Sequence, residues 1–135
     1  MADNLLSMFD TESASESGSW LHLAVPGTDG DLAYDGKGNP LRIKLKGPDS
    51  DVWTEFQRKA MRHAGKKDTR SAKEVAKEDA HLFARITLDV ENIPGYDKPD
   101  REKLVEMYTQ YKDIRIQSLR YLMNQENFIG KSLTD

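Results

Sequence analysis

The sequence contains no cysteine, so a disulfide framework and thiolate catalysis are both excluded. No apolar run approaches the roughly 20 residues that a transmembrane helix needs. The N-terminus, Met1–Asn4, has neither the basic nor the apolar region of a signal peptide, so we expect a cytoplasmic protein. With 37% hydrophobic residues in a chain of 135, the composition predicts one domain with a modest core.

Recognisable catalytic and ligand-binding motifs are also missing. His22, His63 and His81 lie in different predicted elements without the paired spacing of a zinc motif. The glycine-containing segment Asp35–Asn39 has no Gly-Lys-Ser/Thr and no helix after it, which favours a hairpin turn over a phosphate-binding loop. No serine lies in a nucleophile elbow. We therefore expect a binding or assembly protein, not an enzyme, with no metal and no cofactor.

Residues 1–19 are predicted to be a disordered N-terminal tail. The polar run Asp10–Ser19 cannot bury enough apolar surface to offset the entropy of ordering it. Just before this run, Leu5, Leu6, Met8 and Phe9 form a short apolar cluster. Two interpretations of the cluster stay open, a frayed terminus or a short motif that docks on a partner.

Residues 20–46 have the pattern of a small antiparallel sheet of two or three strands. An apolar segment ends at Pro26-Gly27, and Leu41–Lys46 alternates apolar with basic residues, which is typical of a strand with one solvated face. A sheet of this size needs a helix against its apolar face to be stable.

Helical periodicity dominates the rest of the chain. Asp49 or Ser50 is placed to cap a first helix that ends at Gly65. Ser71-x-x-Glu74 is a capping box for a second helix, whose apolar stripe includes Val75 and extends to Val90.

A third helical stretch starts at Asp97-x-x-Asp100, with Pro99 in its first turn. A change of apolar phase near Lys112 predicts a break into two helices, with one bent helix as the alternative. The predicted fold class is α+β and helix-dominant, an N-terminal sheet followed by three or four helices. The predicted domains are a 1–19 tail, a single domain at 20–129 and a 130–135 C-terminal tail.

One segment has a strong local charge. Between Arg58 and Lys73 the single acid is Asp68, although the whole chain has a net charge of −3. Three interpretations remain open: a solvated helix end and loop, which is favoured; a surface for an acidic protein; and, least favoured, a nucleic-acid contact, which usually needs a recognisable module. We call these seven residues the basic band: Arg58, Lys59, Arg62, Lys66, Lys67, Arg70 and Lys73.

Several segments together resemble a family of small siphophage proteins that look like tail assembly chaperones. Val25–Gly30 and Gly47–Ser50 are similar to the family's P-x-T-G turn and G-P-D-S helix start. Ala84–Ile93 is similar to its T-x-D-W-x-N-I stretch, although Val90 stands where the family usually has tryptophan. Met107 to Phe128 resembles its closing L-Y and N-F helices.

The resemblance implies a protein that binds the tape-measure protein, and often tail-tube subunits, until the tail tube polymerises. Such a protein needs exposed anchors more than catalytic groups. Aromatic candidates are Tyr108, Tyr111, Tyr121 and Phe128. The alternative for each is core packing, which is favoured for Leu104, Tyr108, Leu119 and Leu122.

Two other functions fit the same sequence. One is a structural virion component, such as a head–tail completion or minor capsid protein. The other is a nucleic-acid-binding regulator that uses the basic helix end.

Overall fold

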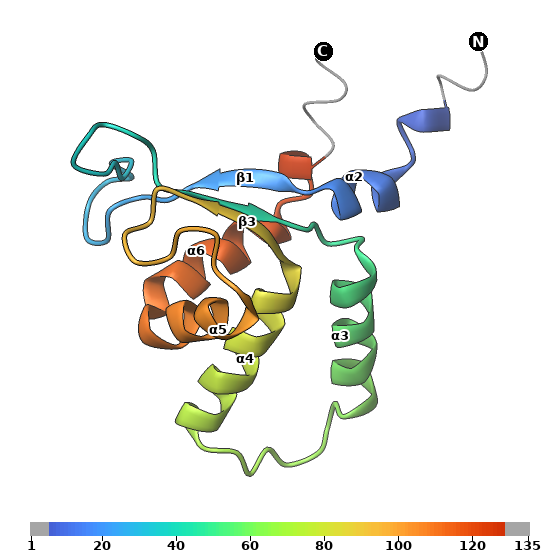
Figure 1. Cartoon of the computed structure of the whole chain (residues 1–135). Helices are drawn as coiled ribbons and strands as arrows, with labels where there is room; N and C mark the ends of the chain where they lie inside the picture. Colours follow the sequence, from blue (N-terminus) through green and yellow to red (C-terminus); the bar gives the residue numbers. More distant parts are fainter. Residues whose placement is uncertain (1–5, 129–135) are drawn as a thin grey trace.

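The computed structural model describes residues 6–128, and it confirms a helix-dominant α+β fold. A three-stranded antiparallel sheet lies over α4, α5 and α6, and α3 stands to one side beside α4 (Figure 1). The elements in chain order are α2 (Thr11–Ser17), β1 (Ser19–His22), β2 (Arg42–Leu45), α3 (Asp51–Arg62), α4 (Ala72–Ile86), β3 (Thr87–Glu91), α5 (Arg101–Gln110) and α6 (Lys112–Met123).

The sheet buries one face and leaves the other without a helix. Its strand order is β1-β2-β3, and the register places Leu21 opposite Ile43 and Ile43 opposite Val90. These three side chains are buried on the helical side. On the other face Arg42 donates to the carboxylate of Glu91. The alternation in residues 41–46 therefore predicted β2 correctly.

The third strand is not where the sequence suggested. Val90 was predicted on a helical stripe, which is wrong, because α4 ends at Ile86 and Thr87 begins β3. The Thr87 hydroxyl donates to the Phe83 carbonyl at 2.7 Å, and β3 then pairs with β2. Within residues 20–46 only β1 and β2 form, while Leu32 and Tyr34 make single bridges.

Residues 11–17 form α2, in place of the predicted disorder. The helix is held by polar contacts, which a search for apolar periodicity does not detect. Ser15 is 1% exposed; its hydroxyl accepts from the Asp49 N–H and its carbonyl from the Gly47 N–H. The Glu16 carboxylate accepts from the Asp51 N–H at 2.7 Å and so caps α3 from another element. Of the apolar cluster before α2, Leu5 lies outside the described residues, as do residues 130–135.

The other helix ends follow the sequence signals with small shifts. Ser71 caps α4 by accepting from the Glu74 N–H at 3.2 Å. Asp100 caps α5, so Pro99 precedes the helix and does not lie in its first turn. The predicted break falls at Tyr111, between α5 and α6.

Side chains of α6 cover the open edge of β1 and of the segment that follows it. The Gln117 amide accepts from the Ala24 N–H and donates to the Ala24 carbonyl, both at 2.8 Å. The Tyr121 hydroxyl donates to the Trp20 carbonyl at 2.8 Å. These bonds satisfy backbone groups that would otherwise invite another strand. Among residues 6–128, no helix is both long and apolar enough to cross a membrane.

Replacing Gly47 tests whether α2 and the end of the chain meet as described. A Cβ at residue 47 would lie 2.7 Å from Ser15 Oγ and 2.8 Å from the Phe128 ring. We expect Gly47→Ala to lower the free energy of unfolding by about 1–3 kcal/mol because of this overpacking. Gly36→Ala is the matched control, since nothing lies within 4 Å of a Cβ there. Equal stability of the two variants in urea unfolding would contradict the packing.

Replacing Gln117 tests the contact between α6 and Ala24, which follows β1. Gln117→Leu leaves the Ala24 N–H and carbonyl unpaired in a partly buried position, so we expect a loss of about 1–3 kcal/mol. Gln57→Leu, at an exposed position on α3, is the control and should change stability by less than about 0.5 kcal/mol. Thermal unfolding of both variants measures the difference, and a tolerant Gln117 site would count against the edge contact.

Candidate functional site

The first turns of α3 attach it to the core, and its second half stands away from α4. Trp53 is 5% exposed and stacks on Phe56 with ring centroids 5.0 Å apart. Two turns later Ala60 is exposed and Met61 is 79% exposed. In the sequence, Ala60 and Ala64 follow Phe56 at helical spacing, but alanine offers too little apolar surface to pull the helix end onto α4.

A hollow of about 840 Å³ lies between α3 and α4, and we call it the α3–α4 groove. Apolar side chains from α3, from the turn after it and from α4 line it: Phe56, Ala60, Ala64 and Leu82. Residues 63–71 connect the two helices at the far end of the groove (Figure 1). The groove therefore offers an apolar interior that is reached from the surface.

All seven residues of the basic band are exposed, and four of them line this groove: Lys59, Lys66, Lys67 and Arg70. Arg58 pairs with Glu55 at 2.9 Å, and Arg70 pairs with Asp68 and Glu78. The other five form no ion pair with any residue in the described range: Lys59, Arg62, Lys66, Lys67 and Lys73. Unpaired positive charge is thus concentrated beside an apolar hollow.

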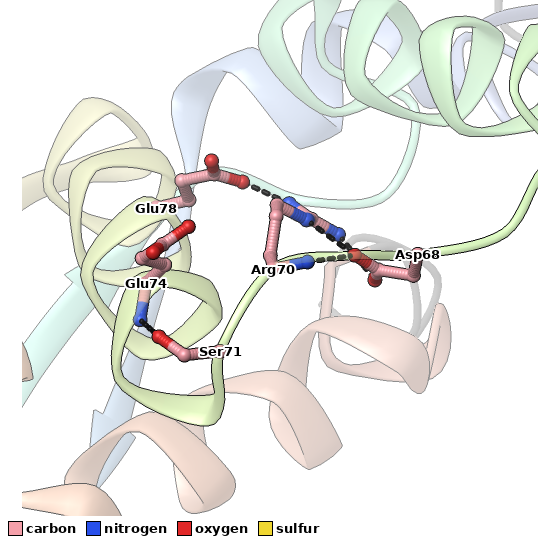
Figure 2. A network of polar contacts seen from close by, with 5 residues as sticks. All are labelled: Asp68, Arg70, Ser71, Glu74 and Glu78. Atoms are coloured by element: carbon pink, nitrogen blue, oxygen red, sulfur yellow. Dashed lines mark hydrogen bonds and ion pairs between the residues drawn. The ribbon is translucent and has the colours of Figure 1, made fainter.

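Arg70 fixes the loop at the end of the groove. Figure 2 shows its guanidinium between Asp68 and Glu78, next to the Ser71 cap of α4. The Arg70 N–H also donates to the Asp68 carboxylate at 3.0 Å. These hydrogen bonds lower the pKa of Asp68 to about 2.

The acids of the groove are mostly engaged. Glu55, whose pKa is lowered by its hydrogen bond with Arg58, and the two partners of Arg70 are all paired. Burial raises the pKa of Asp79, and the charges of Arg115 and Arg70 oppose that shift. Among residues 6–128, four cations of the lining form no ion pair, so the available charge of the groove is positive: Lys59, Lys66, Lys67 and Arg85.

The aromatic anchors are, with one exception, structural. Tyr108 is fully buried and Phe128 is 6% exposed, so neither is an exposed anchor as first suggested. The Thr87 hydroxyl donates its hydrogen to the Phe83 carbonyl, so the Tyr108 hydroxyl must donate to Thr87 Oγ1, at 2.6 Å. Burial raises the pKa of Tyr108 to about 12. Tyr121 is partly buried and bonded to β1.

Tyr111 remains exposed, at 43%, and borders a second hollow of about 430 Å³. Leu23, Val25 and Ile114 also line this hollow, at the start of α6. Of the residues for which core packing was favoured, Leu104 and Leu122 are buried, whereas Leu119 is 41% exposed.

The histidines do not form a metal site in the described range, where no cluster of three or more histidines and carboxylates has metal-binding geometry. His22 makes a hydrogen bond to the Ala33 carbonyl at 2.9 Å. His63 and His81, far apart in sequence, both line the α3–α4 groove.

The basic band is visible in the sequence, but the α4 wall of the groove that faces it is not. Leu82 and Arg85 were assigned to no site, because their place opposite α3 depends on how the two helices meet. The sequence signal for the groove was that small alanine side chains, Ala60 and Ala64, follow Phe56 on the same apolar stripe.

No protein family, curated protein or solved structure matches the chain.

The Arg70 contacts predict the titration of Asp68. A carboxyl whose pKa is depressed in the folded state stabilises the fold above its unfolded pKa, here near 3.8, and that contribution is lost as pH falls through about 2. In Arg70→Gln we expect the Asp68 pKa to rise from about 2 toward 3.8. NMR titration of the side-chain carboxyl measures it, with Arg120→Gln as control. An unchanged pKa in Arg70→Gln would rule out the contact.

Proposed function

We propose that this chain is a tail assembly chaperone of a tailed phage, which binds the tape-measure protein, tail-tube subunits or both during tail morphogenesis. In this proposal it acts in the host cytoplasm and has no catalytic activity of its own. The segments quoted above for residues 20–129 supply the resemblance from which the proposal starts.

The observation that supports it best is the α3–α4 groove. Within this hollow of about 840 Å³, the apolar side chains of Phe56, Ala60, Ala64 and Leu82 are suited to contacting apolar side chains that a subunit exposes before assembly. The unpaired lysines around it add charge that is screened by salt, which favours association that can be reversed. Both properties fit a partner that is held and then released.

Co-expression tests the proposal directly. We expect the chain to raise the soluble fraction of the tape-measure protein encoded in the same genome at least several-fold over expression without it. A tape-measure protein that stays equally insoluble would overturn the proposal. Mass spectrometry of purified particles separates this function from that of a virion component, because a chaperone should be missing from mature virions.

A nucleic-acid-binding regulator is the second candidate, because five cations of the basic band are unpaired within the described residues. Its affinity for DNA or RNA should fall steeply as salt rises. Absence of binding at low salt would end this alternative.

A further inference from the structure

We propose that the α3–α4 groove receives an amphipathic α-helix of its partner, with acidic residues beside the apolar stripe of that helix. This inference rests on the proposed function, since it supposes that the partner is a protein. It specifies the chemistry of the segment that is bound and the surface that binds it.

The shape of the groove favours a helix. α3 and α4 flank it as two walls, joined at one end by residues 63–71 (Figure 1). The lining residues Glu55–His63 extend over roughly 12 Å along α3, which is about two helical turns. An amphipathic helix of the partner that lies between these walls can place its apolar side chains, at positions i, i+3 and i+4, against the groove over that length.

The lining supplies matching chemistry. Phe56 and Leu82 offer apolar contacts, and the small side chains of Ala60 and Ala64 leave room for the side chains of another helix. Extended peptides have a less suitable site beside β1, because Tyr121 bonds the Trp20 carbonyl on its open edge and Gln117 bonds Ala24 just beyond its end.

The charges specify an acidic helix. Lys59 on α3 and Arg85 on α4 border the apolar interior from opposite walls, and Lys66 and Lys67 lie at its end. A helix with acidic residues on either side of its apolar stripe therefore meets a cation on both flanks. All four cations are exposed, so the strength of these pairs should fall as salt rises.

The same lining argues against nucleic acid as the occupant. Phe56 in the lining is already stacked on Trp53, which leaves one of its two faces unavailable to a base.

A binding assay with a defined probe tests the inference. The probe is a fluorescein-labelled 18-residue peptide with leucine at helical i, i+3, i+4 and i+7 spacing and glutamate at flanking positions. Controls are a scrambled peptide of the same composition and a peptide with lysine in place of glutamate. We expect the periodic acidic peptide to bind at least tenfold more tightly than either control and to gain helicity on binding.

Two variants separate charge from shape. Lys59→Glu/Lys67→Glu should weaken binding at least tenfold, whereas Lys37→Glu/Lys112→Glu changes the net charge equally and should leave it unaltered. Ala60→Lys adds a positive charge but blocks the apolar interior, so it should weaken binding of the peptide and not that of a 20-nucleotide single strand. Residue 60 is exposed, and thermal unfolding verifies that the variants fold.

Each contrary result has a defined meaning. Equal binding of the periodic and scrambled peptides, or no effect of Lys59→Glu/Lys67→Glu, overturns the helix-binding groove. Tighter binding of the oligonucleotide than of the peptide at 150 mM salt would assign the basic band to nucleic acid. If the chain solubilises the tape-measure protein but does not bind the peptide, this inference fails and the proposed function stands.

Discussion

The arrangement of this molecule depends on how α4 becomes β3 at Thr87. The Thr87 hydroxyl donates to Phe83, which satisfies a carbonyl at the helix end, and accepts from the buried Tyr108 hydroxyl. This junction fixes the direction of α4 relative to the sheet, since the very next residues pair with β2. It also joins α5 to the same point, so that sheet, α4 and α5 meet around one polar contact inside the core.

The position of α3 follows from that frame. β2 leads into α3 through Gly47, where Ser15 and the Phe128 ring approach so closely that no side chain fits. From this corner, α3 packs on the core through Trp53 and then diverges from α4. The divergence leaves the α3–α4 groove open and places the basic band around it, which is why the two features occur together.

Local patterns in the sequence were sufficient for much of the fold. The alternation around Ile43 predicted β2, and Ser71 and Asp100 marked helix starts. The helix-to-strand switch at Thr87 was missed because Val90 fits a helical stripe as well as a strand, and pairing with β2 decides between them. α2 was missed because polar contacts hold it. The basic band was visible in the sequence, but the groove beside it depends on how far apart α3 and α4 stand.

Chemical-shift mapping of the ¹⁵N-labelled chain locates the binding surface residue by residue. On titration with the periodic acidic peptide, we expect the largest amide shifts in residues 56–70 and 78–85 of the α3–α4 groove, with β1 and β3 little changed. Shifts concentrated around Tyr111 and the start of α6, or on the uncovered face of the sheet, with none in α3, would contradict this expectation.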